Sequence, residues 1–391
     1  MITKIQVQNF KSLENLSLDC SYLNVLTGLN GMGKSSIIQI LLLLRQSYER
    51  GLLQEGLALN GDLVQIGLVK DALYEFADIE ELNFKLDFFV NNQEIKKDWR
   101  FIRDVNDIDN PEEERTYSGS DFMPYSTEED ADKFRDLKDL NILSLFKHNA
   151  FKYLNADRWV KNEYETSDFN VVRNKNLGKH GQYTAHYLDY FGTQKVSDEL
   201  VFEGTDNNEL AFQVSAWMSY ISPGTKVKTE RVSGSESIKL RYVFEEDGIN
   251  TTELKPLNVG FGITYILPVL VALLSAKKGD ILVIENPESH VHPKAQSIIG
   301  QLIAKVATIG IQIFVETHSD HLLNGIRIAV KNGVFNESIK LFFFDRIKSK
   351  EKAKIYSTYQ SPVIEQDGNV SFWPDDFFDQ AVKDLNYLFD I

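Results

Sequence analysis

The sequence predicts an α/β fold with a mixed β-sheet at its core. Three observations lead to this prediction. A glycine-rich stretch, Gly28–Ser35, lies between an apolar strand-like run and a helix-like run. Two short apolar runs, Ile281–Ile284 and Ile311–Val315, are each followed by a glutamate, as expected for buried strands with polar groups at their carboxyl ends. Residues Leu82–Phe101 alternate apolar and polar side chains, which is typical of antiparallel strands.

The composition narrows the class of protein. The chain has 391 residues, of which 43% are hydrophobic, enough to bury a substantial core. Its net charge of −15 argues against a protein that coats DNA indiscriminately, because phosphate neutralisation needs clustered Lys and Arg. Cys20 is the only cysteine, so the chain can form neither an intramolecular disulfide nor a cysteine-rich metal site. The N-terminus alternates like a strand and the apolar runs are too short to span a bilayer, so we expect a cytoplasmic protein without membrane contact.

The first strand-like runs, Ile2–Phe10 and Leu16–Leu26, lead into the glycine-rich stretch, which reads G-x-x-x-x-G-K-S. In this motif the glycines let backbone N–H groups surround a phosphate chain. The lysine reaches the β- and γ-phosphates, and the hydroxyl ligates Mg²⁺. We therefore predict that a nucleoside triphosphate and Mg²⁺ bind to the residues Asn30, Gly31, Gly33, Lys34, Ser35 and Ser36.

Two further polar residues have two interpretations each. Lys11 follows the first strand-like run and is either a solvated turn residue or a basic group beside the nucleotide. Gln65 follows the turn Asn60-Gly61 and is either a surface residue or a contact to the metal or to an attacking water.

The middle of the chain is less specific. Arg103–Asp139 is rich in acidic residues and predicts a long loop or a partly disordered insert, which is either solvated or acts as a lid or partner-binding arm. The region 150–255 predicts a mixed α/β segment with helices at Tyr183–Phe191 and Ala211–Ile221. Arg158 either supports the nucleotide site or a dimer face, or forms an ordinary ion pair. Sustained heptads are absent, so we expect no long coiled coil.

The acidic residue Glu285 directly follows an apolar strand. At this position a carboxylate can accept a hydrogen bond from a metal-bound water. The following stretch Asn286–Pro293 holds two histidines and a second acid, Glu288, and a zinc centre is the alternative interpretation. His318 follows the next strand and is a candidate hydrogen-bond donor to the γ-phosphate, with a structural role as the alternative.

Two glycines, Gly260 and Gly262, precede a long apolar helix-like run that ends near Ala276. A glycine-rich helix start offers a second anion-binding surface. Because the chain already has one phosphate loop, we expect this second surface to act on the ATP of another subunit. The prediction is a homodimer with ATP between the two copies.

These motifs together resemble the ABC-type ATPase heads of the SMC, RecF and OLD group, and in particular stand-alone bacterial ATPases such as the Septu-like anti-phage subunits. The resemblance covers residues 1–70 and 255–345 and includes the I-E-x-P-E-x-H-x-H-P and E-T-H-S-x-H-L signatures. It implies that Glu285 takes the Walker B position, Gly260–Gly262 the signature position and His318 the switch-histidine position. Lys11 matches a basic position after the first strand.

Two departures from the family pattern concern hydrolysis and dimer contact. The usual Asp-Glu pair is here Glu285-Asn286, and an amide cannot accept a proton from water. Hydrolysis is then either slow or assisted by Glu288 as the base. The signature also lacks its usual Leu-Ser-Gly-Gly form, so the contact of Gly260 with an opposing phosphate is inferred.

The resemblance implies four parts of the chain. Residues 1–75 form the N-terminal part of the ATPase head, 76–255 the antiparallel strands and the inserted mixed α/β region, 256–345 the C-terminal part of the head, and 346–391 an extension. In the extension, Phe377, Phe378, Leu385 and Leu388 suggest one apolar helical face that packs on the head or on a partner.

The function implied is an ATPase that acts as a dimeric switch and gates a separate effector, a nuclease or toxin of an anti-phage system. Higher oligomers and DNA are further candidate partners. The alternatives are a RecF- or SMC-like DNA-repair ATPase and an ATP-stabilised scaffold with little turnover. A nuclease domain within the chain is not expected, because only about fifty residues follow Phe344.

Overall fold

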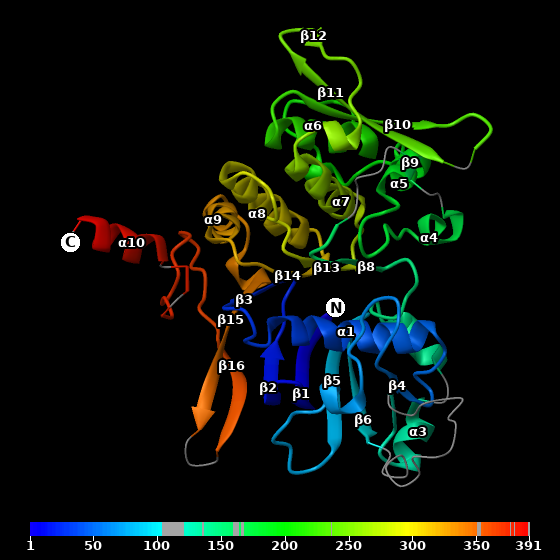
Figure 1. Cartoon of the computed structure of the whole chain (residues 1–391), viewed down its shortest axis with the longest axis vertical. Coiled ribbons are helices and arrows are strands. Elements are labelled where there is room, and N and C mark those ends of the chain that lie inside the picture. The colour runs from blue at the N-terminus through cyan, green and yellow to red at the C-terminus, as the bar shows by residue number, and fades with distance from the viewer. Residues whose placement is uncertain are drawn as a thin grey trace. The chain divides into compact units, whose positions relative to one another are not determined.

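The computed structural model describes residues 1–103, 121–134, 137–158, 164–165, 168–235, 237–349, 353–375, 377–378 and 380–389. Figure 1 shows its helices and strands. Residues 104–120 and 135–136 of the predicted acidic loop lie outside the described part, so its interpretation as a solvated segment, lid or partner-binding arm is not tested. The described part is not a loop throughout, because Phe122–Pro124 form a strand and Glu128–Phe134 form a helix. In the described residues, none of the helices combines the length and the apolar character needed to cross a lipid bilayer.

The chain forms two compact units that interleave in sequence. The first unit comprises Met1–Ser21, Leu26–Lys147 and Phe342–Ser361, and the second comprises Tyr22–Val25, His148–Leu341 and Pro362–Ile391. The strands β3 (Leu23–Gly28) and β15 (Ile339–Ser349) each pass from one unit into the other.

The first unit contains a four-stranded antiparallel sheet. Its order is β2-β1-β5-β6, with β1 at Ile2–Phe10, β2 at Leu13–Asp19, β5 at Glu81–Val90 and β6 at Gln93–Ile102. The inward side chains form an aromatic core, in which the rings of Phe10 and Phe84 lie 5.4 Å apart and Trp99 stacks on Phe134 at 5.3 Å. Such contacts add to the free energy gained from burying the ring areas.

Helix α1 (Lys34–Glu49) follows the glycine-rich loop in the first unit. Its residues Ile37–Leu44 are buried apart from the half-exposed Gln39, as expected for a helix that is apolar on nearly all sides. The other elements of this unit are β4 (Gly56–Ala58), α2 (Val69–Ala72), β7 (Phe122–Pro124), α3 (Glu128–Phe134), η2 (Leu137–Ile142) and β16 (Lys354–Gln360), which pairs antiparallel with β15.

The second unit is built on the parallel strands β8 (Phe151–Leu154), β13 (Ile281–Glu285) and β14 (Gln312–Glu316), in the order β14-β13-β8, with the start of β3 beside β14. Helix α7 (Phe261–Ser275) packs on β13 and β8, and α8 (Pro293–Thr308) packs on β14 and on α9 (Asp320–Lys331), as Figure 1 shows. Parallel strands covered by helices are buried, which explains their unbroken apolar sequences.

The remaining elements of the second unit are shorter. They are β9 (Tyr164–Glu165), α4 (Phe169–Arg173), α5 (Thr184–Phe191), η3 (Asp198–Leu200), α6 (Leu210–Ile221), β10 (Thr225–Arg231), β11 (Ile238–Glu246), β12 (Ile249–Asn250), η4 (Pro256–Asn258), η5 (Asn336–Ser338) and α10 (Gln380–Phe389). The predicted helices at Tyr183–Phe191 and Ala211–Ile221 correspond to α5 and α6.

The structure corrects two details of the sequence prediction. The run Leu16–Leu26 is not one strand, because the chain breaks at Cys20–Tyr22 and its two halves join different sheets as β2 and β3. In the C-terminal extension, Phe377 is fully buried and contacts Trp373, whereas Leu385 and Leu388 on α10 are 52% and 70% exposed. The predicted apolar helical face is therefore not buried on α10, and the contacts described for Phe377 lie within the extension itself.

Candidate functional site

The glycine-rich loop has the backbone geometry of a phosphate cradle. Gly31 and Gly33 adopt φ angles of 77° and 100°, in the left-handed region that favours glycine. Lys34 begins α1, and its ammonium donates to the carbonyls of Gly28 and Leu29 at 3.0 and 2.8 Å. Asn30 and Ser35 are exposed on the loop and on the first turn of the helix, and Ser36 is buried there. The exposed loop face and the helix N-terminus therefore offer backbone N–H groups to an anion.

Below the loop, the space at Gly33 is closed by two hydroxyl groups. A Cβ at this position would lie 2.8 Å from Oγ of Ser357 and 3.1 Å from Oγ of Ser12. The Ser357 hydroxyl donates to that of Ser12 at 2.7 Å, which fixes β16 against the turn between β1 and β2. A side chain at position 33 would push the loop away from this support, so the glycine is required by packing as well as by φ.

The two ambiguous residues of this unit have different settings. Lys11 has a left-handed backbone with a φ of 53°, and its ammonium donates to Oε1 of Gln39 on α1 at 2.9 Å. Burial lowers the pKa of Lys11, and the charge of Asp71 opposes this effect. Gln65 is exposed, in an isolated bridge with Asn60. Lys11 is therefore anchored to the helix that follows the loop, whereas Gln65 shows no comparable anchoring.

Glu285, at the end of β13, is held in place by Tyr153 on β8 and by Ala156, which follows that strand. The Tyr153 hydroxyl donates to Oε1 of Glu285 at 2.9 Å, and the Ala156 N–H donates to Oε2 at 3.4 Å. Burial raises the pKa of Glu285, and these two hydrogen bonds oppose the effect. Because a carboxylate has about four lone-pair positions, Glu285 keeps acceptor capacity for a metal-bound water.

Asn286 and Glu288 follow in the loop after β13. Glu288 is buried and accepts the His318 N–H at 2.8 Å through Oε1, so it connects the loops after β13 and β14. Among the described residues, neither Oε2 of Glu288 nor Oδ1 of Asn286 has a hydrogen-bond partner. Burial raises the pKa of Glu288, and the hydrogen bond from His318 opposes this effect. Two buried acceptors without partners fit a site that is completed by a polar ligand such as an ordered water.

The structure places Arg158 as a clamp on the backbone that carries these acids. Its side chain is fully buried, and its guanidinium donates to the carbonyls of Tyr265 and Asn155 at 3.1 and 2.9 Å. It also donates to the carbonyls of Glu285 and Asn286 at 2.7 and 2.6 Å. Burial lowers the pKa of Arg158 to about 10, so it stays charged at neutral pH. These carbonyl contacts support the acidic loop directly, without the ion pair considered as the alternative.

The two glycines before α7 serve different purposes. Gly260 is the N-cap of the helix, and a Cβ there would meet no atom within 4 Å. A Cβ on Gly262 would lie 2.4 Å from the carbonyl oxygen of His290, so this glycine is required by packing on the loop after β13. Beside them, Phe261, Tyr265 and His290 form an aromatic cluster with ring distances of 4.7 to 5.1 Å. The start of α7 is therefore open at Gly260 and tightly packed from Gly262 onward.

The histidines of this region are separated in space by the fold. His292 caps α8, where its Nδ1 accepts the Lys294 N–H at 3.2 Å. His318 is exposed, and Ser319 caps α9 by accepting the Leu322 N–H at 3.0 Å. Within the described ranges, no group of three or more His, Cys, Asp or Glu side chains could hold a metal ion. This finding removes support for the zinc alternative.

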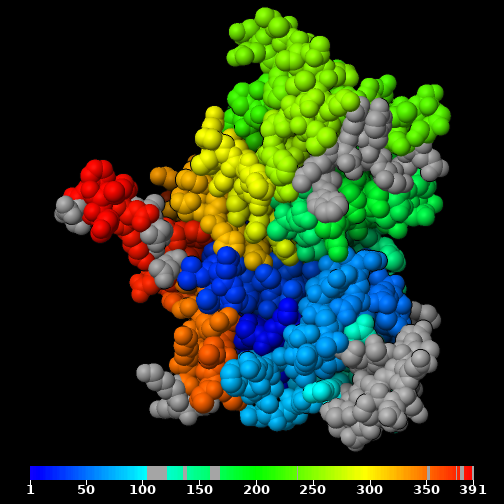
Figure 2. Space-filling view, viewed as in Figure 1, coloured from blue at the N-terminus to red at the C-terminus, as the bar shows by residue number. Residues whose placement is uncertain are grey.

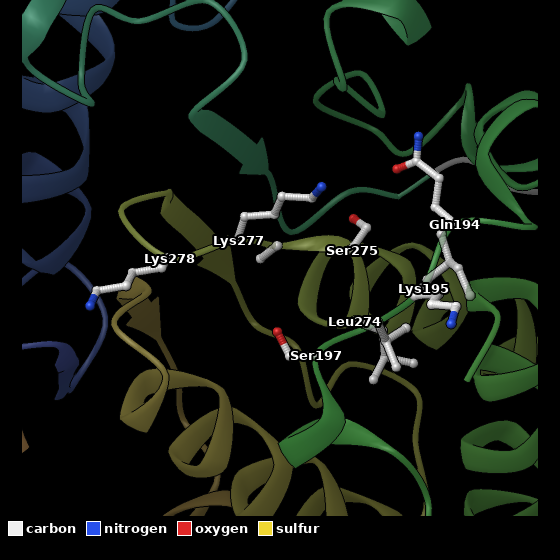
Figure 3. A pocket seen from close by; sticks show the side chains of 10 residues that line it. Gln194, Lys195, Ser197, Leu274, Ser275, Lys277 and Lys278 are labelled. Atoms are coloured by element: carbon white, nitrogen blue, oxygen red, sulfur yellow. The ribbon is translucent and has the colours of Figure 1, made fainter. Parts of the chain in front are cut away.

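A cavity of about 280 Å³ lies at the other end of α7 (Figure 3). Its lining comes from the segment Gln194–Ser197, from Leu210 and from Leu274–Lys278. In Figure 3 the Lys278 side chain extends away from the other labelled side chains. The lining contains no acidic side chain, and it includes the carbonyl end of a helix, which disfavours anions. The lining also includes Lys195, Lys277 and Lys278, so the cavity is basic, but it lacks the glycine-rich turn and the helix N-terminus of the phosphate loop.

Comparison with known families decides the classification. The family model described as "AAA domain, putative AbiEii toxin, Type IV TA system" matches residues 23–324, which is more than half of the chain. The chain belongs to this family. A second model, described as a protein of unknown function (DUF3696), matches residues 335–388. Among curated proteins no sequence match was found.

This AAA-family chain has the same fold as one solved structure. It is similar to an Smc head bound to the C-terminal winged-helix domain of ScpA, with 13% identity, a TM-score of 0.51, and coverage of 93% of this chain and 98% of the other. The SMC head of Thermotoga maritima aligns with 14% identity and a TM-score of 0.43, over 92% and 99% of the two chains. The P-loop ATPase head predicted from the sequence is therefore confirmed as the fold, including its mixed and antiparallel sheets.

Three residues beside the motifs of this AAA-family chain were not predicted as site residues. Tyr153 holds Glu285, Ser357 supports the loop at Gly33, and Arg346 donates from β15 to the carbonyl of Gly31. Each lies more than a hundred residues from its partner in sequence and in no recognised motif. No sequence signal indicated these three roles, because each depends on a contact between segments far apart in the chain.

Proposed function

We propose that the chain is an ATP-gated dimeric switch that binds and hydrolyses ATP and controls a separate effector. Lys34 and the loop N–H groups would bind the phosphates, and Ser35 and Glu285 are the oxygen donors that suit Mg²⁺. When bound, Mg²⁺ would neutralise charge on the phosphates. The observation that carries the proposal is the glycine loop with Lys34 directed onto its carbonyls, since this arrangement serves a phosphate chain.

For hydrolysis we propose Glu288 as the general base. The raised pKa of this buried carboxylate brings it closer to the working pH of a base, and its Oε2 has no hydrogen-bond partner among the described residues. His318 is tied to Glu288 through its backbone N–H, and its exposed ring would report the presence of the γ-phosphate.

For the dimer we propose that Gly260 and the start of α7 contact the nucleotide of a second copy. The open space at Gly260 supports this role, because a phosphate can approach the helix N-terminus there without a Cβ in the way. ATP contacts formed only in the closed dimer would provide the differential affinity that a switch requires. Two names support an effector or partner: the family description refers to a toxin–antitoxin system, and the similar Smc head binds ScpA.

The first test measures ATP turnover and mass together. We expect Lys34→Ala to abolish ATP binding, and Glu288→Gln to stop turnover while the dimer still forms with ATP. Unchanged turnover in Glu288→Gln would reject the base assignment. Light scattering with a non-hydrolysable ATP analogue should show a dimer for the wild type but a monomer for Gly260→Asp, because aspartate adds both a side chain and a negative charge to an anion site. A monomeric wild type under these conditions would reject the switch.

The second candidate function is an ATP-stabilised scaffold with little turnover. Asn286 favours it, since an amide stands at the position next to Glu285 and its Oδ1 is buried without a partner in the described structure. The ATP turnover of two variants distinguishes the scaffold from the switch. In a scaffold, Asn286→Glu should create turnover that the wild type lacks, whereas in the switch the wild type already hydrolyses ATP and Glu288→Gln removes that activity.

A further inference from the structure

Arg346 is a charged residue at the phosphate loop that the proposed function does not use. It lies on β15, its side chain is exposed, and its guanidinium donates to the carbonyl oxygen of Gly31 in the middle of the loop. A Cβ on Gly31 would lie 3.7 Å from Nη2 of Arg346, so the guanidinium reaches the loop at a residue without a side chain. The contact joins residues 315 positions apart within the first unit.

The hairpin that carries Arg346 is fixed to the loop at a second point. Arg346 pairs with Ser357 in the antiparallel register of β15 and β16. The Ser357 N–H donates to the Ser12 carbonyl at 2.8 Å, and its hydroxyl lies under Gly33. Figure 2 shows the same adjacency, with the orange surface of the hairpin beside the blue N-terminal residues. Arg346 is therefore held at the loop by a rigid strand pair, which reduces the entropy lost when it binds a ligand.

The chemistry of the guanidinium group suits a phosphate. Arginine has five N–H donors, and the bond to Gly31 uses only part of this capacity. The remaining donors can bind two phosphate oxygens at once, which a lysine ammonium does less well. The chain as a whole carries a net charge of −15, so a cation at this loop is not explained by a generally basic surface.

We propose that Arg346 contacts the phosphates of the nucleotide bound to the loop of its own chain. It stays anchored on the Gly31 carbonyl and directs its other donors to phosphate oxygens. The inference rests on the proposed binding of ATP to the loop and adds a residue from the C-terminal strand pair to that site. The competing role is purely structural: Arg346 would only stabilise the loop when no ligand is bound, a brace for which its hydrogen bond to the Gly31 carbonyl is sufficient.

The test measures nucleotide affinity of the full chain with a fluorescent ATP analogue and Mg²⁺. We expect Arg346→Ala to raise Kd about tenfold or more, as for the loss of a charged hydrogen bond. Arg346→Lys should recover part of the loss. The matched control is Lys348→Ala, which removes an exposed cation two residues further along the same strand and should leave Kd within about twofold.

Arg346→Gln separates a phosphate contact from a brace. Its amide can still donate to the Gly31 carbonyl, but it carries no charge. A phosphate contact predicts that Arg346→Gln binds as weakly as Arg346→Ala. Wild-type affinity in Arg346→Gln, or equal affinities of Arg346→Ala and Lys348→Ala, would overturn the inference and leave the proposed function intact. A wild type that binds no ATP would instead overturn the proposed function.

Discussion

At the scale of single residues, Arg158 has the largest number of described contacts in the acidic half of the site. Its guanidinium donates to four carbonyls from three segments, among them those of Glu285 and Asn286. In the described structure this buried guanidinium also lies 5.7 Å from the centroid of the Tyr265 ring, so it fixes the path of several backbone segments. The position of Glu285 and Glu288 therefore depends on a residue that no motif includes.

We expect Arg158→Lys to lower the free energy of unfolding by about 3 kcal/mol or more. A lysine ammonium cannot reach all four carbonyls, and each buried acceptor left without a donor costs about 1–3 kcal/mol. Urea denaturation of the wild type and the variant measures the loss. The control is Arg173→Lys at an exposed position on α4, which should change stability by less than about 0.5 kcal/mol. Equal stability of both variants would contradict the clamp.

We predict that Glu288→Gln stabilises the fold at neutral pH. Burial raises the pKa of Glu288 above its unfolded value, so the folded state binds the proton more tightly and ionisation costs stability. The contribution of the Glu288 carboxyl to the free energy of unfolding is therefore fully present below its unfolded pKa and is lost as the pH rises through its folded pKa. Glutamine avoids this loss and keeps an oxygen for the His318 N–H.

The expected gain for Glu288→Gln is on the order of 1 kcal/mol at pH 7 and vanishes near pH 4. Melting temperatures of both proteins across this range measure it. A gain that stays constant with pH would show that ionisation of Glu288 is not its cause.

The sequence predicted the local elements around Lys34 and Glu285, whose roles in the site remain predictions. Lys34 and Glu285 lie in short motifs in which strand, loop and helix are adjacent in the chain, and the structure shows these elements. Tyr153 and Arg346 could not be predicted, because their partners are far away in sequence and their residue types are common on strand surfaces. Asn286 was recognised in the sequence as a departure from the pattern. Only the fold shows that its buried Oδ1 has no hydrogen-bond partner among the described residues.

At the scale of elements, α8 and α9 approach closely through two glycines. A Cβ on Gly325 would lie 2.0 Å from the Ser297 carbonyl oxygen, and one on Gly300 would lie 2.2 Å from that of Leu322. This pair of helices carries the loops on which Glu288 and His318 lie. Their spacing is therefore part of the geometry of the site.

Gly325→Ala should separate the two helices and cost about 1–3 kcal/mol, because the obstructing carbonyl oxygen of Ser297 belongs to backbone that cannot rotate away. Gly260→Ala is the matched control in the absence of nucleotide, since a Cβ at that N-cap meets no atom within 4 Å. Thermal unfolding of both variants checks the prediction. If Gly325→Ala melts together with Gly260→Ala, the helices tolerate a wider spacing.

Periodicity predicted helices and strands well where one face or all faces are apolar. It joined Leu16–Leu26 into one strand, because the polar break at Cys20–Tyr22 is short and both sides are apolar. It also assigned Phe377 and Leu388 to one helical face, although α10 begins only at Gln380. Apolar spacing shows that a face can be buried, but it does not identify the surface that buries it.

At the scale of the whole molecule, segments distant in sequence fold together. The unit that contains the phosphate loop combines the N-terminal residues, the middle of the chain and Phe342–Ser361. Neither composition nor turn signals at these positions indicate which segments associate, because the associations are made by pairing of strands. The sequence therefore predicted which segments form helices or strands, but it held no signal for which of them fold into the same unit.

Ligand binding should stabilise the whole chain by mass action. We expect Mg²⁺ and a non-hydrolysable ATP analogue at a hundred times Kd to add about 2.7 kcal/mol to the free energy of unfolding. The melting temperature measures this increase, and Lys34→Ala should show none. A wild type whose melting temperature is insensitive to the nucleotide would contradict binding to the native fold.

The ammonium of Lys34 already has two oxygen partners within its own loop. The ammonium has therefore lost hydrating water before any ligand arrives, and a phosphate that binds would replace these carbonyl oxygens with its own oxygens. The energetic barrier of stripping water from a cation is removed from the binding step and has been met during folding.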